Sequence, residues 1–308
     1  MNAIRKALIF ILIGVMAMSL SACESWTPVT VVDEIPSEHL KAVKENAGTV
    51  TLITYPSKDY FGDMSDITKQ AYIYLPPNYD ESKQYNVVYL LHGIGGDIWE
   101  WGMTGDSSDV KKIMDNLINE GTIDPFIVVT PNGRAAKKHG PDGDMNSFYV
   151  FGKELRYSLI PYIDANYATY AEGAGTDEYD ITAARDHRAV GGLSMGGMQT
   201  TNIALCECLD MFSYFGAFSS CPTTYTADKI ASCLEEFPDY DIKYFYNLCG
   251  TDDGIAISHH SAAVEGLCDL TDKLTDGKNF MWHTRSGGHD FNIWRLGFYN
   301  FSQIVFTR

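Results

Sequence analysis

Gly191-Gly192-Leu193-Ser194-Met195-Gly196-Gly197 is the stretch that decides the predicted fold of this chain. It contains a Gly-x-Ser-x-Gly pattern between a strand-like run at 187–190 and a helix-like segment at 198–209. A serine between a strand and a helix sits on a sharp turn that exposes its hydroxyl beside backbone N–H groups. The glycines allow the strained turn and the close approach of helix and strand. We therefore interpret Ser194 as a candidate nucleophile.

Strands and helices alternate on both sides of this stretch. An antiparallel hairpin is predicted at 49–55 and 70–75. Further strands are predicted at 86–91, 125–130, 188–193, 214–218, 243–249 and 279–284, and helices at 107–119, 151–166, 198–209, 259–274 and 292–304. This order predicts a mostly parallel central sheet with helices on both faces, which is the α/β class and the layout of the α/β-hydrolase fold. The loops 131–149, 219–241 and 250–258 follow strand ends, so we expect them to wall a cleft over the edge that carries Ser194.

A serine nucleophile needs a base to take its proton and an acid to orient that base. In this layout the chain order is serine, then Asp or Glu, then histidine. Asp252 and Asp253 follow the strand at 243–249, and spacing alone does not choose between them. His289 lies in a glycine-rich loop before the last predicted helix, whereas His283 lies inside a strand, where a packed or surface role is expected.

The negative charge that develops on an attacked carbonyl oxygen needs two N–H donors. One donor is expected from the residue after the nucleophile, which is Met195. The other is expected from the loop after an early strand, which here reads His92-Gly93-Ile94-Gly95-Gly96, with the Ile94 N–H as the candidate. Both would act through the backbone.

Composition limits the class of protein. The chain has 308 residues, of which 45% are hydrophobic, enough for one large α/β domain, predicted at 48–308. Its formal net charge of -17 argues against binding to a nucleic-acid backbone.

The N-terminus has the pattern of an export signal. Arg5 and Lys6 precede an apolar stretch at 7–20, which ends in Leu20-Ser21-Ala22-Cys23. This resembles a bacterial lipobox, which predicts a lipoprotein signal peptide at 1–22, lipidation at Cys23 and a polar tether at 23–47. The protein would then be exported and held at the bacterial membrane or surface only through its lipid. The alternative is an ordinary secretory signal that is cut nearby.

Six cysteines follow Cys23, namely Cys206, Cys208, Cys221, Cys233, Cys249 and Cys268. Cys221 and Cys233 flank one loop and could pair, but spacing does not establish a disulfide. His259 and His260 are expected to form a surface pair rather than a metal site. The predicted hydrolysis needs no metal and no cofactor.

Ordered motifs over about residues 48–306 resemble the feruloyl esterases attached to bacterial xylanases, in the esterase D-like group that also contains acetyl xylan esterases. The motifs begin with Tyr74-Leu75-Pro76-Pro77 and Tyr89-Leu90-Leu91-His92-Gly93-Ile94-Gly95-Gly96. They continue with Val129-Thr130-Pro131-Asn132, Leu159-Ile160-Pro161-Tyr162-Ile163 and the Ser194 stretch, and they end with Cys249-Gly250-Thr251-Asp252-Asp253 and Gly287-Gly288-His289-Asp290-Phe291-Asn292.

The resemblance implies Ser194 as nucleophile, His289 as base, Asp253 rather than Asp252 as acid, and Ile94 and Met195 as oxyanion donors. It also implies release of feruloyl groups from plant xylan by an acyl-enzyme mechanism. The alternatives are an acetyl xylan or other carbohydrate acetyl esterase, an acyltransferase, and a non-catalytic glycan-binding protein. Four tryptophans, at 99, 101, 282 and 294, could stack on sugar or phenolic rings or lie in the core.

Overall fold

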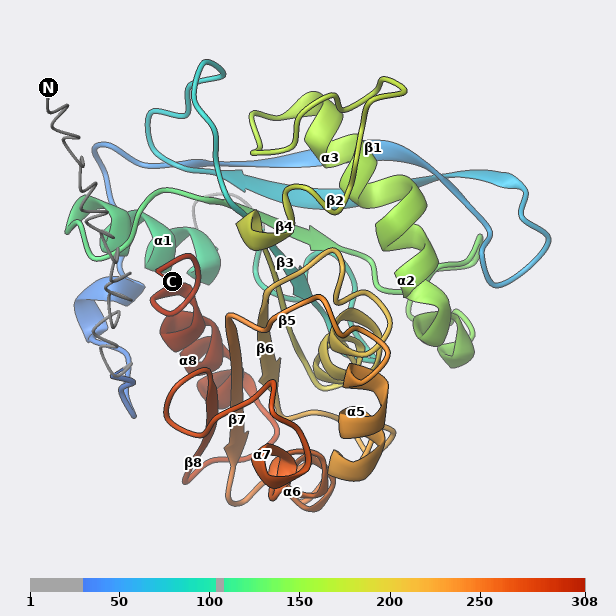
Figure 1. Ribbon diagram of the computed structural model, residues 1–308. Coiled ribbons are helices and arrows are strands. Elements are labelled where there is room, and N and C mark those ends of the chain that lie inside the picture. The colour runs from blue at the N-terminus through green and yellow to red at the C-terminus, as the bar shows by residue number, and fades with distance from the viewer. Residues whose placement is uncertain (1–29, 104–107, 308) are drawn as a thin grey trace, which may run out of the picture.

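One eight-stranded sheet organises the protein (Figure 1). The computed structural model describes residues 30–103 and 108–307. The strand order is β1-β2-β4-β3-β5-β6-β7-β8, and all neighbours from β4 to β8 run parallel, whereas β1 and β2 form an antiparallel hairpin that also pairs antiparallel with β4. The bounds are β1 Thr49–Lys58, β2 Asp66–Leu75, β3 Val87–Leu91, β4 Ile127–Pro131, β5 Arg188–Leu193, β6 Tyr214–Phe218, β7 Tyr244–Gly250 and β8 Phe280–Arg285.

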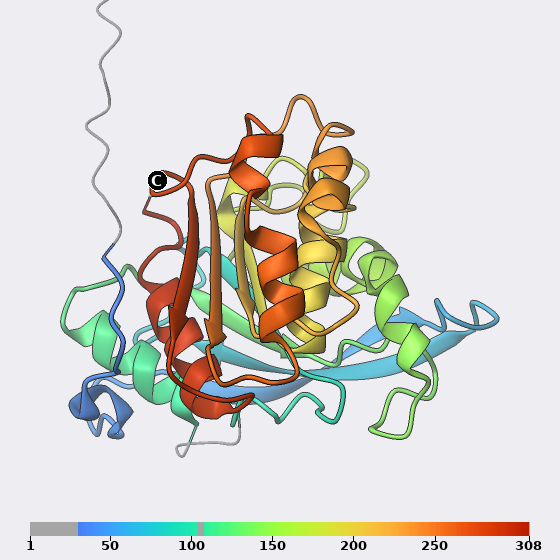
Figure 2. The ribbon, with the colours of Figure 1, turned by 90° about the horizontal axis from the view of Figure 1, so that it is seen from below.

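Helices cover both faces of this sheet, as Figure 2 shows from below. The α-helices are α1 Asp109–Asn119, α2 Phe151–Glu154, α3 Ile160–Asn166, α4 Met195–Met198, α5 Ala227–Leu234, α6 Ile257–Val264, α7 Leu267–Leu270 and α8 Phe291–Ser302. Shorter or irregular turns are η1 Ser37–Leu40, η3 Met145–Val150, η4 Leu155–Leu159, η5 Arg185–His187 and η6 Gln199–Leu205. Val88 and Leu90 pack under α1 and α8, while the alternate residues Val87 and Tyr89 pack under the helices of the other face.

The predicted fold class is confirmed, because every predicted strand lies in this one sheet with helices on both sides. Among the predictions that differ from the structure are one helix and one loop. The stretch predicted as one helix at 259–274 is divided into α6 and α7 at Gly266, whose φ of 75° is left-handed. The stretch 219–241, predicted as a loop, contains α5, whose apolar face packs into the core through Ile230 and Leu234.

The described part of the predicted tether, residues 30–47, lies against the domain instead of extending from it. Val31, Ile35 and Leu40 pack on the core beneath α1 and α8. The backbone of Val32 exchanges two hydrogen bonds, of 3.1 and 3.0 Å, with the side chain of Asn300 in α8. Burial of these apolar side chains gives the segment a fixed position. The predicted signal peptide at 1–22 and lipidation at Cys23 lie outside the described residues.

All six described cysteines are free thiols. Cys233 lies in α5, and the Sγ of Cys221 lies 3.2 Å from the Sδ of Met195. The pairing of Cys221 with Cys233 that the sequence left open is therefore not present. Within residues 30–103 and 108–307, no helix is both long and apolar enough to cross a membrane.

Candidate active site

Ser194 occupies the turn between β5 and α4 in a strained conformation. Its φ of 52° and ψ of -111° are sparsely populated for a residue with a side chain, and such strain is common at functional sites. The turn is tight because a Cβ added at Gly192 would lie 2.6 Å from the carbonyl carbon of Gly196. A Cβ at Gly196 would lie 2.4 Å from the oxygen of Leu91. Both positions therefore need glycine for the turn to form.

His289 bridges Ser194 and Asp253 by two hydrogen bonds. Its Nε2 lies 3.0 Å from the Ser194 Oγ, and its Nδ1 lies 2.8 Å from the Asp253 Oδ2. A carboxylate only accepts hydrogen bonds, so the Nδ1–H donates to Asp253 and leaves Nε2 to accept from the serine hydroxyl. The ring of Trp294 in α8 packs edge-on against the His289 ring with centroids 5.0 Å apart, which restrains its orientation.

Asp253 is fully buried at the end of β7. Burial alone raises the pKa of this carboxyl, but hydrogen bonds from His289, from the backbone N–H of Ala256 and from Ser219 outweigh it and lower the pKa below its ordinary value. Ser219 has a left-handed φ of 46° at the end of β6. The carboxylate is thus held ionised beside the histidine.

The Asp252 carboxylate binds the loop before His289 and not the imidazole ring. Its Oδ2 accepts hydrogen bonds from the Ser286 hydroxyl at 2.9 Å and from the Gly287 N–H at 3.0 Å. It therefore ties the loop that carries His289 to the end of β7, without touching the imidazole. The structure brings Asp253, and not Asp252, to the histidine.

The two predicted oxyanion donors lie beside the serine. Among the described residues, the N–H groups of Ile94 and Met195 donate to no other protein group. A Cβ added at Gly93 would be 3.4 Å from the Ser194 Cβ, so the loop after β3 runs directly past the nucleophile. Both N–H groups are free to receive an anionic oxygen.

Arg134, from the loop after β4, fixes the loop after β3. It is 1% exposed, and its guanidinium donates to the carbonyl oxygens of Ile94 and Gly96 while it lies 4.5 Å from the Phe148 ring centroid. The Glu100 carboxylate accepts from the Gly93 N–H at 2.6 Å. Sequence reasoning missed both residues, because their partners are backbone groups that no motif marks.

The loop after β4 is itself anchored to the core. Lys69 in β2 is completely buried and donates to the carbonyl oxygens of Asn132 and Arg134 at 2.9 and 2.7 Å, and it forms an ion pair with Glu154 at 2.8 Å. The buried His92 ring accepts from the Gly133 N–H at 2.9 Å. The two loops that face Ser194 are therefore joined by a buried polar network.

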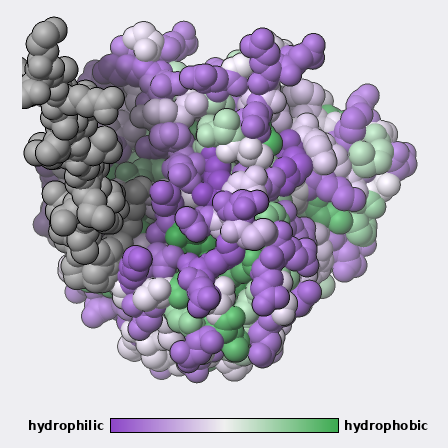
Figure 3. Space-filling model, viewed as in Figure 1, coloured by the Kyte–Doolittle hydropathy of each residue, from purple (hydrophilic) through white to green (hydrophobic). Residues whose placement is uncertain are grey.

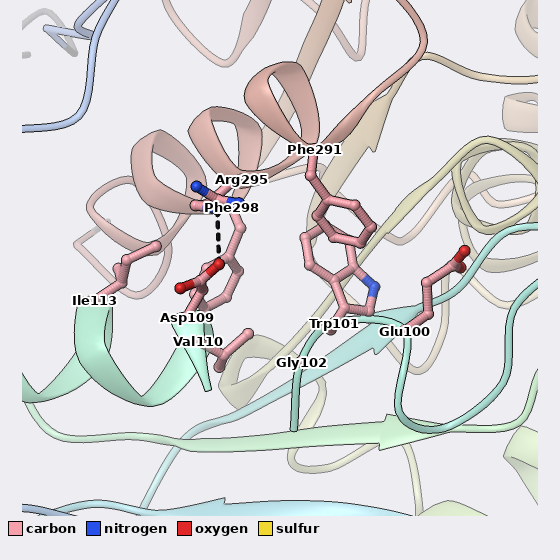
Figure 4. Close-up of a pocket in the computed structure, with 9 residues that line it drawn as sticks. All are labelled: Glu100, Trp101, Gly102, Asp109, Val110, Ile113, Phe291, Arg295 and Phe298. Atoms are coloured by element: carbon pink, nitrogen blue, oxygen red, sulfur yellow. Dashed lines mark ion pairs between the residues drawn. The ribbon is translucent and has the colours of Figure 1, made fainter. Parts of the chain in front are cut away.

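A cavity of about 230 Å³ adjoins this network through Glu100 (Figure 4). The rings of Trp101 and Phe291 pack edge to face at one end of the cavity, with their centroids 5.8 Å apart. An ion pair between Asp109 and Arg295, at 2.9 Å, lies at the other end. Trp101 is thereby a core residue, and Trp294 is also buried, whereas Trp282 is half-buried. Of the four candidate stacking tryptophans, Trp99 alone is largely exposed, at 51%.

His260 corrects the expectation of a surface pair. His259 is exposed, but His260 is fully buried, with Nδ1 accepting from the Ser220 N–H at 3.2 Å and Nε2 3.1 Å from the Asn247 oxygen. His283 lies between the Tyr246 hydroxyl and Asp33, both at 2.8 Å, in the packed role expected. Within the described ranges, no group of three or more His, Cys, Asp or Glu side chains is arranged to hold a metal.

The sheet order, the strained serine turn and the loops that meet at the carboxyl ends of β3, β5, β7 and β8 define an α/β-hydrolase. Residues 66–300 match the family model Esterase, described as "Putative esterase". The chain belongs to this esterase family.

Relatives and solved structures give the same assignment. The chain is 32% identical over 270 residues to an endo-1,4-beta-xylanase/feruloyl esterase of Xylanibacter ruminicola, and 35% identical over 208 residues to endo-1,4-beta-xylanase Y of Acetivibrio thermocellus. These alignments cover 85% and 65% of this chain but only 32% and 18% of the relatives, so the chain spans a third or less of their length. A serine-to-alanine mutant of the feruloyl esterase module from Clostridium thermocellum, complexed with sinapinate, superposes with a TM-score of 0.73 at 25% identity over 92% of this chain and 96% of the module.

Proposed function

We propose that this protein is a serine carboxylic ester hydrolase that removes feruloyl groups from the side chains of plant xylan. One observation carries the proposal, namely the hydrogen-bond chain from Ser194 through His289 to the buried Asp253. The substrate class is supported by similarity, because the Xylanibacter ruminicola relative is named a xylanase/feruloyl esterase and a similar module was solved with sinapinate, a hydroxycinnamate.

In the proposed reaction, the Ser194 Oγ attacks the ester carbonyl while its proton passes to the His289 Nε2. Asp253 accepts a hydrogen bond from the His289 Nδ1–H and stabilises the imidazolium that forms. The N–H groups of Ile94 and Met195 receive the negative oxygen of the tetrahedral intermediate. His289 then donates its proton to the departing sugar oxygen, which leaves the acyl group on Ser194, and a water activated by His289 releases the acid.

The test is release of ferulate and acetate from arabinoxylan by the wild type and by Ser194→Ala. We expect ferulate release by the wild type and a loss of at least about a thousandfold in the variant, because the nucleophile is absent. Release of acetate alone would favour a carbohydrate acetyl esterase. Release of neither acid would contradict the xylan substrate, and equal rates in the two proteins would contradict the mechanism.

We also propose that the protein is exported and anchored to the bacterial membrane or surface by a lipid on Cys23, with residues 1–22 removed. The motif at 20–23 supports this. The Cys23→Ala variant should move from the membrane fraction to the soluble exported fraction, while Ser21→Thr, a neighbouring change that keeps the cysteine, should not. Retention of Cys23→Ala in the membrane fraction would refute lipidation at this residue.

A further inference from the structure

A groove separate from the Ser194 site lies at the end of the hairpin between β1 and β2. It has a volume of about 390 Å³ and runs between the hairpin and η4. Ser57, Tyr60 and Met64 line it from the hairpin, and Tyr157 and Ser158 line it from η4. Figure 1 shows the hairpin projecting past the other strands beside α2, and apolar surface is visible at this side of the molecule in Figure 3. Pro56, Lys58 and Asp66 complete the lining, and we call these eight residues the hairpin groove.

The groove offers flat apolar surface to solvent. Tyr157 is 67% exposed, and Met64 is 48% exposed. Tyr157 stands on a π-helical turn between α2 and α3, and such turns frequently occur at functional sites. Exposed aromatic rings with a polar tip are typical of surfaces that bind a ligand with one apolar face.

The floor of the groove carries a hydroxyl that lacks a partner. Ser57 is 4% exposed, and within the described residues its Oγ makes no hydrogen bond. Beside it, the Tyr60 hydroxyl and the Ser158 Oγ bond each other at 2.8 Å and keep further donor and acceptor capacity. A buried hydroxyl without a partner is unfavourable, so a ligand with hydroxyl groups would gain by satisfying it.

The charges around the groove favour an uncharged ligand. Lys58 pairs with Asp66 across the hairpin at 2.6 Å. The other charged residues of the hairpin end are Asp59 and Asp63, so the stretch 56–66 has one lysine against three aspartates, and its net negative charge disfavours an anionic polymer. The exposed Tyr157 ring near one unpaired hydroxyl, without net positive charge, fits the C–H face and hydroxyl groups of a neutral sugar.

The groove lies at the same edge of the sheet as Ser194. Ala71 of β2 pairs with Pro131 at the carboxyl end of β4. The part of β2 that precedes Ala71, from Asp66 onward, therefore extends beyond the carboxyl end of β4, and the turn of the hairpin lies further out in the same direction. The Phe61 N–H donates to the Ala135 oxygen in the loop after β4, at 3.0 Å. A second copy of the chain fits this edge poorly, because Pro56 in the edge strand β1 has no N–H to pair.

We propose that the hairpin groove is a second binding site, for an uncharged sugar segment of the polysaccharide whose ester is cleaved at Ser194. This inference rests on the proposed function for its substrate class. It assigns to Tyr157 the stacking of a sugar ring and to Ser57 a hydrogen bond to a sugar hydroxyl.

The test measures binding without catalysis. Migration in native gels that contain soluble arabinoxylan is compared for Ser194→Ala alone and with Tyr157→Ala, Tyr157→Phe, Ser57→Ala or Phe61→Ala added. We expect Tyr157→Ala to weaken binding about three- to tenfold and Ser57→Ala about twofold, while Tyr157→Phe retains it. Phe61→Ala is the matched control, because Phe61 is an aromatic residue 41% exposed on the same hairpin that does not line the groove.

The same substitutions are then made in the active enzyme. Hydrolysis of methyl ferulate should be unchanged in Tyr157→Ala, while ferulate release from the polymer should fall by the factor measured for binding. The proposal that the groove binds sugar would be refuted if Tyr157→Ala bound arabinoxylan as well as its parent, or if Phe61→Ala weakened binding equally. It would also be refuted if Tyr157→Ala lost self-association and not sugar binding. If the wild type releases no ferulate but binding still depends on Tyr157, the proposed function fails and the groove stands.

Discussion

Asp252 and Asp253 are adjacent in the chain but have different partners, which leads to a prediction at the scale of single residues. Asp253→Asn removes the carboxylate that orients His289, so we expect kcat on methyl ferulate to fall at least about a thousandfold. Asp252→Asn keeps an oxygen that can accept from Ser286 and Gly287, so its effect should stay below about tenfold. A larger loss in the Asp252 variant would refute the assignment of the acid.

The sequence alone could predict part of this site. Ser194, His289, Ile94 and Met195 stand in motifs whose order follows from the fold, and the structure brings the first two into contact. The sequence could not distinguish Asp252 from Asp253 by spacing, because a turn after a strand can direct either carboxylate inward. Which carboxylate reaches His289 depends on the position of the Gly287 N–H, which binds Asp252 from 35 residues further along the chain.

At the scale of elements, the loops after β3 and β4 depend on each other through Arg134. Arg134→Lys keeps the charge but loses the planar fork that reaches two carbonyl oxygens, at Ile94 and Gly96. The Ile94 N–H should then be held less well toward the oxyanion. We expect kcat on methyl ferulate to fall about ten- to a hundredfold with KM within about threefold, because the N–H matters most in the transition state.

Arg156→Lys is the matched control for this prediction. Arg156 also makes a bidentate contact, to Asp210 at 2.7 and 2.8 Å, but on the outside of η4. It should leave kcat unchanged. An unchanged kcat in Arg134→Lys, or a loss of activity that follows the melting temperature in both variants, would show that Arg134 only stabilises the fold.

The elements that sequence analysis missed share one physical feature. In α5, the buried residues Ala227, Ile230, Ala231 and Leu234 have helical spacing, but polar residues on both sides favoured a loop. Residues 30–47 are mostly polar, and they are held on the domain by three apolar side chains and by hydrogen bonds to polar groups such as Asn300, Tyr299 and His283. Such segments take their structure from the surface they cover, which local periodicity cannot report.

At the scale of the whole molecule, two fully buried histidines lie near the site. His92 lies in the loop after β3, and His260 lies in α6 behind Asp253. Burial lowers the pKa of His92 to about 4 and that of His260 to about 3, because the charged ring would lose its hydration. Both are therefore neutral in the folded protein near pH 7.

This burial predicts that acid destabilises the fold well before the carboxylates titrate. In the unfolded chain a histidine takes up its proton near pH 6.5, whereas in the fold it resists until about pH 3 to 4. The stabilisation is thus complete above pH 6.5 and declines as the pH falls toward the folded values. Between pH 7 and pH 5, each histidine should lower the free energy of unfolding by about 2 kcal/mol.

Urea unfolding at pH 7 and pH 5 measures this loss directly. His260→Gln keeps a side chain that can bond the Ser220 N–H and Asn247 but cannot titrate, so its loss between the two pH values should be smaller than that of the wild type by about 2 kcal/mol. The control is His259→Gln, since this neighbouring ring is exposed and should leave the pH dependence as it is. If His260→Gln and the wild type lose equal stability on acidification, His260 is not the group that makes the fold acid-sensitive, and the remaining dependence would have to come from His92 and the carboxylates.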